Sequence, residues 1–168
     1  MSVLSQDEKE LGACLIDIGG GTTDIAIFKD GQIITTKVIP VGGDHVTRDI
    51  AHELKTPVNE AEIIKIEHAA TLSKLNGTDT LIDVPSVGDR EARKTDRKVL
   101  ASVVEQRYEE IFEVINTEVG KISLESLRAG VILTGGASKL DGAVELAETV
   151  FGCDVRLGYP KPMSGAFE

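Results

Sequence analysis

The chain has 168 residues, of which 41% are hydrophobic, enough to build one domain or two small lobes around a core. Only 4% of the residues are aromatic and tryptophan is absent, so we expect a mainly aliphatic core. A net charge of −10 argues against a nucleic-acid-binding surface, which would need clustered lysine and arginine.

The cysteines and the chain ends indicate the cellular setting. Cys14 and Cys153 stand in apolar surroundings without metal-ligand spacing, so we expect reduced, buried thiols in a cytosolic protein. The polar first ten residues are unlike a signal peptide, and no apolar run approaches the roughly 20 residues of a membrane span. The chain begins just before one predicted strand and stops soon after another, which suggests a region of a longer protein.

The first forty residues predict a three-stranded antiparallel meander. Residues 11–18 form an apolar run that ends in an acid, and residues 22–28 alternate near their end. Residues 32–39 are rich in β-branched side chains, which favour strands. Asp30-Gly31 is a strong signal for the hairpin turn between the last two.

Two helices should follow this meander. Asp44 is the expected N-cap of the first, in which apolar residues recur every four positions up to Leu54. Thr56-Pro57 should end it, and Asn59 can cap a second helix over residues 59–72.

The next segment is more irregular. Asn76-Gly77 predicts a turn, residues 80–84 a short strand, and residues 85–94 an exposed basic loop. From Thr95 to about Ile122, an apolar stripe predicts one long amphipathic helix.

The last third alternates strand and helix. Residues 131–133 predict a buried strand before a glycine turn, residues 141–150 a helix, and residues 154–157 a final strand. Alternation of this kind indicates an α/β layer structure.

The stretch IDIGGGTTDIAIF, residues 16–28, sets three glycines between two predicted strands. A hairpin turn whose N–H groups point inward can bind an anion, and glycine allows a phosphate to approach closely. Thr22 and Thr23 can add donors, and Asp17 can hold Mg²⁺ through water, with Asp24 as a second candidate. The alternative is a plain glycine-rich hairpin.

A second glycine turn, Gly135-Gly136, follows the strand at residues 131–133. Two turns at strand ends can hold the phosphate and nucleoside ends of one ligand. Neither turn has the spacing of a P-loop or a Rossmann fingerprint, so those sites are disfavoured.

These motifs resemble a known superfamily. The stretch DIGGGTTD at 17–24 resembles the second phosphate-binding hairpin of actin, Hsp70 and the sugar kinases, and LTGGA at 133–137 resembles their adenosine-binding turn. Residues 38–69, 83–94 and 105–119 resemble the FtsA family of bacterial cell-division proteins. The resemblance covers nearly the whole chain and places it in the C-terminal actin-like half of the longer family protein.

The resemblance implies an α/β fold, an actin-like, ribonuclease H-like lobe. Its mixed sheet would contain the antiparallel meander and carry flanking helices. Residues 1–54 and 129–168 would form this core subdomain, which carries the nucleotide turns. Residues 55–128 would form a smaller inserted α/β subdomain with a partner-binding surface.

The family also implies a site for ATP with Mg²⁺. The phosphates would meet one turn, Asp17 would lie near the metal, and the adenosine would meet the other turn. Glu62 and Lys65 match the residues that reach ribose and base, although at this spacing they could equally form a surface ion pair. The full set is Asp17, Gly19, Gly20, Gly21, Thr22, Thr23, Glu62, Lys65, Gly135, Gly136 and Ala137.

We expect no enzyme activity from this chain, because no positioned base is visible. A weak ATPase would need the full-length protein. The other phosphate hairpin belongs to the first half of the family protein, so ATP binding by this chain should be weak or undetectable.

The implied partner is the C-terminal tail of the tubulin-like protein FtsZ, which the family tethers to the inner membrane. The matching positions are Arg93, Arg107 and Glu110, charges that suit a tail with acids and a base. The alternative is a solvated face of a long helix. The family binds the cytoplasmic side of the membrane through a C-terminal amphipathic helix, not found in this sequence, and self-associates through both halves.

Two other kinds of protein share the glycine turns. One is a different actin-like scaffold, such as the MreB or PilM type. The other is a sugar or acetate kinase, which would need a catalytic acid from the other half. The blocks at 83–94 and 105–119 favour the cell-division adaptor over both.

Overall fold

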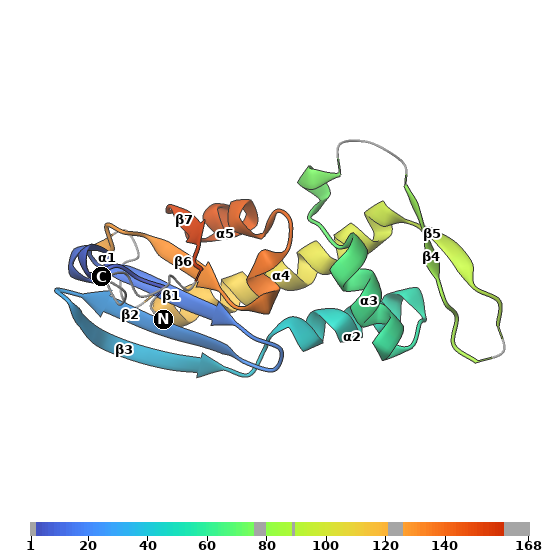
Figure 1. Cartoon of the computed structure of the whole chain (residues 1–168), viewed down its shortest axis with the longest axis horizontal. Coiled ribbons are helices and arrows are strands. Elements are labelled where there is room, and N and C mark those ends of the chain that lie inside the picture. Colours follow the sequence, from blue (N-terminus) through green and yellow to red (C-terminus); the bar gives the residue numbers. More distant parts are fainter. Residues whose placement is uncertain (1–2, 76–79, 89, 121–125, 160–168) are drawn as a thin grey trace, which may run out of the picture.

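The computed structural model describes residues 3–75, 80–88, 90–120 and 126–159. Its main layer is a five-stranded sheet with the strand order β3-β2-β1-β6-β7 (Figure 1). The strands pair antiparallel from β1 to β3 and parallel from β1 through β6 to β7. The predicted mixed sheet with an antiparallel meander is therefore confirmed. The strand bounds are β1 Ala13–Ile18, β2 Thr23–Lys29, β3 Gln32–Ile39, β6 Val131–Thr134 and β7 Val155–Leu157.

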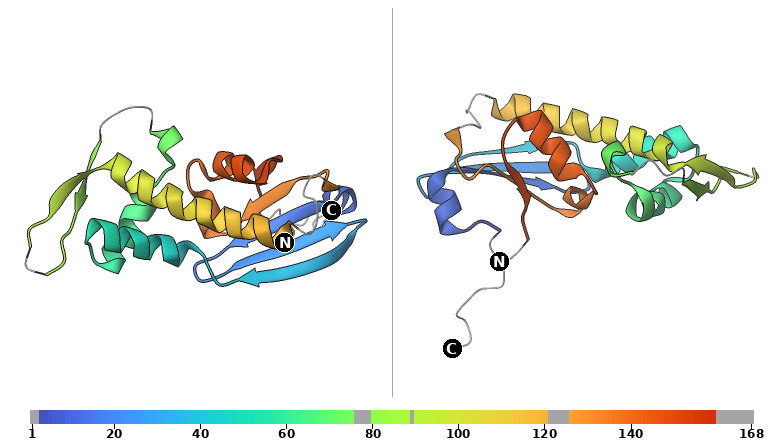
Figure 2. Two further views of the ribbon diagram at one scale, coloured as in Figure 1. Left: turned by 180° about the vertical axis from the view of Figure 1, so that it is seen from behind. Right: turned by 90° about the horizontal axis from the view of Figure 1, so that it is seen from above.

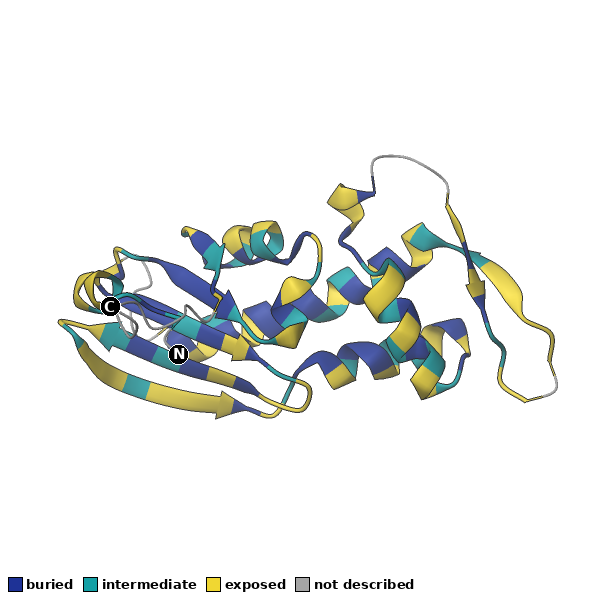
Figure 3. Ribbon diagram, viewed as in Figure 1, coloured by how far each residue is buried: buried dark blue, intermediate teal, exposed yellow. Residues whose placement is uncertain are grey.

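The predicted turn between β2 and β3 is also confirmed. Asp30 and Gly31 both adopt positive φ angles, 52° and 80°, as the favoured two-residue hairpin turn requires. β3 is an edge strand and most of its side chains are exposed, whereas β1 and β2 bury alternate residues (Figure 3).

Two helices cover the buried face of this sheet, α4 (Arg97–Val119) and α5 (Ala143–Phe151). The apolar stripe of α4 packs against the isoleucines of β1 and β2 in one core. This core is mainly aliphatic, as the composition predicts, with Phe112 as its largest fully buried side chain.

α4 is long enough to link two regions of the molecule. One end lies under the sheet and the other reaches a region made of α2 (Gly43–Leu54), α3 (Val58–His68) and a two-stranded sheet (Figure 2). That small sheet pairs β4 (Leu81–Val84) with β5 (Arg93–Asp96). Short 3-10 helices, η1 (Leu72–Lys74) and η3 (Gly136–Lys139), complete the fold.

The structure corrects the expected starts of α2 and α3. Gly42 rather than Asp44 is the N-cap of α2, and the N–H of Gly42 donates to Nδ1 of His45 at 3.2 Å. Pro57 rather than Asn59 precedes α3, consistent with the preset φ of proline. The helix ends at His68, because Thr71 donates its N–H to the Asp141 carbonyl and the chain leaves the helical path.

The prediction of an exposed loop over residues 85–94, followed by a helix from Thr95, was wrong for residues 93–96. Residues 93–96 form β5, because they find a partner in β4. Asp96 then caps α4 by accepting the N–H of Lys98 at 2.9 Å. The expected turn at Asn76-Gly77 and the expected helix end at Ile122 lie outside the described residues.

The short helix α1 (Gln6–Leu11) is fixed by a capping box and an ion pair. The carboxylate of Glu8 accepts hydrogen bonds from two guanidinium nitrogens of Arg156 on β7, the shortest at 2.6 Å. Partial burial acts to raise the pKa of Glu8, but Arg156 and the Ser5 N–H outweigh it and lower that pKa.

Both cysteines are free thiols. Cys14 is buried, and its burial raises the pKa of the thiol to about 12, while Cys153 is partly exposed. Within the described ranges, no helix has the length and apolar character needed to cross a membrane.

Candidate functional site

The pairing of β1 with β6 brings the two glycine turns together. The strands are parallel, with Asp17 opposite Thr134, so the turns that follow them leave the same edge of the sheet. Both turns line one pocket of about 580 Å³, which α2, α3 and α4 also line. Of the predicted residues, the pocket brings together Gly19, Gly20, Glu62, Lys65, Gly136 and Ala137.

The first glycine turn is bonded to the start of α2. Gly19 donates its N–H to the Thr22 carbonyl at 2.9 Å, which closes the turn. The N–H of Gly43 then donates to the Gly19 carbonyl at 2.8 Å, and that of Asp44 to the Gly20 carbonyl at 2.9 Å. A β-carbon on Gly42 would overlap the carbonyl oxygens of Gly19 and Gly20, so this close approach requires glycine.

The second glycine turn depends on Gly135. Its φ of 91° lies in the region that favours glycine, and a β-carbon there would overlap the Asp17 carboxylate and lie 2.5 Å from the Ile18 carbonyl. Tyr108 on α4 holds the next part of the turn by donating its hydroxyl to the Ala137 carbonyl at 2.6 Å. Burial raises the pKa of Tyr108, so this donor keeps its proton.

Glu62 and Lys65 do form an ion pair, at 2.9 Å, but they also line the pocket. Thr47 on α2 lies between them: its buried hydroxyl donates to the Glu62 carboxylate at 2.5 Å and accepts from Lys65 at 2.7 Å. Partial burial acts to raise the pKa of Glu62, yet the bonds from Thr47 and Lys65 lower it.

The Lys65 ammonium also donates to the Gly43 carbonyl, at 3.1 Å. Its three hydrogens thus have three acceptors within the protein. Lys65 therefore joins α3 to the start of α2, and contact with a ligand would require it to exchange one of these bonds.

The other predicted nucleotide residues lie outside the pocket lining. Gly21 and Thr22 are exposed at the tip of the first turn. Thr23 is fully buried, and its hydroxyl donates to the Val41 carbonyl at 2.7 Å, so it does not point toward the pocket. Asp17 is exposed beside Gly135. The structure contains no group of three or more potential metal ligands among its described residues.

The sequence patterns did not indicate four pocket residues with polar side chains: Asp44, Tyr108, Lys139 and Asp141. Asp44 was assigned to helix capping, but its carboxylate faces Gly20, where a β-carbon would lie 3.1 Å from either oxygen. Tyr108 lies in the apolar stripe of α4, and that stripe indicated only a buried position. No local pattern distinguished these residues, because their neighbours in the pocket are distant in the sequence.

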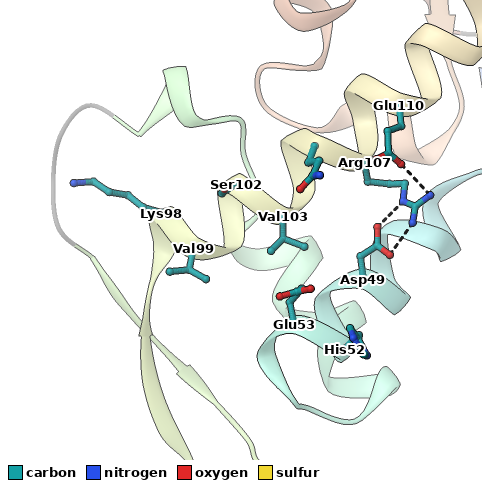
Figure 4. Close-up of a pocket in the computed structure, with 10 residues that line it drawn as sticks. Asp49, His52, Glu53, Lys98, Val99, Ser102, Val103, Arg107 and Glu110 are labelled. Atoms are coloured by element: carbon teal, nitrogen blue, oxygen red, sulfur yellow. Dashed lines mark hydrogen bonds and ion pairs between the residues drawn. The ribbon is translucent and has the colours of Figure 1, made fainter.

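A second, larger pocket of about 650 Å³ lies between α2 and α4 and contains two predicted partner residues (Figure 4). Arg107 pairs with Asp49 through two nitrogens, at 2.5 and 2.9 Å, and reaches Glu110 at 3.4 Å. The side chain of Arg107 is 31% exposed and that of Glu110 is 53% exposed. This α2–α4 groove is therefore lined by charged groups of both signs that solvent can reach.

Arg93 is not brought into the α2–α4 groove. It lies on β5, and its guanidinium donates to the Leu54 carbonyl at the end of α2. Arg97, which the sequence places in the same basic neighbourhood, donates to the His68 carbonyl at 2.8 Å. These two arginines join the small sheet and α4 to the ends of α2 and α3.

Comparison with known proteins identifies the family. The family model described as "Cell division protein FtsA" matches residues 14–167. The chain belongs to the FtsA family. It is 56% identical over 165 residues to the FtsA of Pseudomonas aeruginosa, and 44% identical over 173 residues to that of Escherichia coli K12. Each match covers 98% of the chain but only 40% and 41% of the relatives, so the chain spans about two fifths of their length.

Solved structures agree with an actin-like fold. The chain superposes on MreB5 of Spiroplasma citri bound to ADP with a TM-score of 0.75 and 21% identity, covering 91% of this chain and 50% of that one. A non-polymerising MamK mutant bound to AMPPNP gives a TM-score of 0.69 and 17% identity, covering 86% and 49%. At these identities the similarity establishes the fold alone. The FtsA relatives in turn confirm the family that the blocks in the sequence predicted.

Proposed function

We propose that this chain is the part of an actin-like cell-division adaptor that binds the FtsZ C-terminal tail and forms one wall of an ATP site. The observation that carries the adaptor role is the α2–α4 groove, which presents Arg107 and Glu110 side by side. A peptide carrying an acid and a base meets complementary charges there. The similarity to MreB and to a PilM–PilN complex, by contrast, extends to the fold alone.

Replacing Arg107 by glutamate should weaken binding of a synthetic FtsZ tail peptide at least tenfold, because a partly buried charge of the wrong sign would face the peptide acids. Binding is measured by fluorescence anisotropy at low salt. Arg48→Glu is the matched control: it makes the same charge change at an exposed position of α2 outside the groove, and should leave the affinity unchanged.

Two further observations make this experiment decisive. Circular dichroism must show that both variants keep the fold, since Arg107→Glu also removes the partner of Asp49. A peptide with reversed charges should then bind Arg107→Glu better than it binds the wild type. Equal affinity of the native peptide for wild type and Arg107→Glu would refute the proposed site.

The nucleotide proposal rests on the convergence of Gly19, Gly20, Gly136 and Ala137 on one pocket. In this proposal the phosphates lie against the first turn, the adenosine lies against the second, and Glu62 meets the ribose. Asp17 and Asp44 flank the phosphate turn, so a Mg²⁺ ion held through water would offset their repulsion of the phosphates. A bound Mg²⁺ would neutralise phosphate charge, and the chain's own residues orient the nucleotide.

We expect this chain to bind ATP weakly. Three acids line the pocket, Asp44, Glu62 and Asp141, against two lysines, one of which is fully bonded within the protein. Titration with ATP and Mg²⁺, followed by calorimetry, should give little or no saturable heat, and none without Mg²⁺. A micromolar dissociation constant would contradict this expectation.

We propose no catalytic role for this chain, and therefore prefer the adaptor to a sugar or acetate kinase. The proposal places the longer protein on the cytoplasmic face of the inner membrane at the division site, with self-association as a second activity. Membrane contact would come from the C-terminal amphipathic helix that the family implies.

A further inference from the structure

Beside the α2–α4 groove, a third hollow of about 450 Å³ lies between β3 and α4. Most of its lining is apolar, and it consists of Lys37, Val38, Ile39, Pro40, Val41, Arg107, Glu110, Ile111, Val114 and Glu118. We call it the β3–α4 groove. Ile39 and Ile111 form a buried floor, 8% and 1% exposed.

The walls of the β3–α4 groove are unusually exposed for their residue type. Val38 on the edge strand is 66% exposed and Val114 on α4 is 44% exposed. Single exposed apolar side chains are ordinary, but two that line one hollow offer a surface from which a ligand can displace water. Burying such side chains is the main source of affinity at protein interfaces.

The two grooves are continuous, because Arg107 and Glu110 line both of them. Beyond this pair, the α2–α4 groove follows α4 back to Lys98, while the β3–α4 groove follows it on to Glu118. The Lys37–Glu118 ion pair, at 2.7 Å, marks the far end. From Lys98 to Glu118 the helix rises about 30 Å, the span of about nine extended peptide residues.

We propose that the β3–α4 groove receives the apolar side chains of the same FtsZ tail whose charges meet Arg107 and Glu110. This inference rests on the proposed function and adds residues that determine specificity, Val38 and Val114. A charged pair flanked by an apolar hollow suits one short peptide that carries acids next to aliphatic or aromatic residues. The charges position the peptide along the groove and speed its association. The apolar contacts slow its dissociation.

The test measures tail-peptide binding by Val114→Glu. This change places a charge where an apolar side chain should bind, and the affinity should fall about five- to tenfold. Ile63→Glu is the matched control: Ile63 is 47% exposed on α3 and lines neither groove. It should leave binding unchanged. Val38→Thr, which suits an edge strand, gives the same test if Val114→Glu fails to fold.

A second arm uses a peptide whose apolar residues are changed to serine. This peptide should bind the wild type about tenfold more weakly, and the neutral change Val38→Thr should weaken it no further, since the lost contact is the same one. At high salt the loss caused by the neutral change Val38→Thr should persist, whereas that caused by Arg107→Glu should shrink.

The outcomes separate this inference from the proposed function. If Arg107→Glu abolishes binding while Val114→Glu and Val38→Thr bind as wild type, the groove is not part of the tail site and the inference fails alone. If the wild type does not bind the tail, both fail. A concentration-dependent dimer that Val114→Glu dissociates, with peptide binding unaltered, would assign the groove to a second copy of the chain and overturn the inference.

Discussion

Replacing Gly135 by alanine should destabilise the protein by about 3 kcal/mol. Two effects add at this position. The φ of 91° is strained for any residue with a side chain, and the new methyl group would meet the Asp17 carboxylate and the Ile18 carbonyl. The Ile18 carbonyl belongs to a central strand and cannot move without disturbing the pairing of β1 with β6. The change therefore acts on the junction of the two glycine turns.

The neighbouring glycine is a matched control for this prediction. A β-carbon on Gly136 would meet nothing within 4 Å, so Gly136→Ala should change the free energy of unfolding by less than about 1 kcal/mol. Urea denaturation followed by circular dichroism measures both variants. Equal losses for the two variants would mean that the turns do not meet as described.

The Phe112→Ala variant should lose about 3–5 kcal/mol of stability. Phe112 is fully buried on α4, and its ring packs edge-on against Tyr108 and Phe151, with centroids 6.0 and 5.6 Å away. Phe151 belongs to α5, so this cluster fixes the two helices that cover the buried face of the sheet. Alanine would leave a cavity between them that the surrounding side chains can fill only in part.

The same helix supplies a control for Phe112. Val114 is 44% exposed, so Val114→Ala should cost less than about 1 kcal/mol. Thermal and urea unfolding, with coincident transitions by two probes, would establish that the loss is cooperative. Because α4 reaches both the sheet and the α2–α3 region, Phe112→Ala should lower the unfolding midpoint of both regions together. A loss below about 1 kcal/mol would contradict the packing of α4 on α5.

Local patterns in the sequence determine much of this fold. β-branched runs and the Asp30-Gly31 turn predicted the meander, because strand alternation and turn chemistry act between near neighbours. The apolar stripe predicted which face of α4 is buried, since helical periodicity alone assigns it. The glycine turns and the cell-division blocks predicted the family, which the comparisons confirmed.

Tertiary structure decided what local patterns could not. β5 forms only because β4 lies beside it, and α3 ends at His68 because Thr71 bonds to Asp141. Asp44 and Tyr108 reach the pocket, and Thr47 reaches Glu62 and Lys65, through the packing of helices far apart in the sequence. Backbone propensity and spacing act over a few residues, whereas a pocket is made where distant segments meet. The sequence by itself therefore determined the strands of the main sheet, the Asp30-Gly31 turn and the family. Only the packing of α2, α3 and α4 against the sheet decided which side chains share a site.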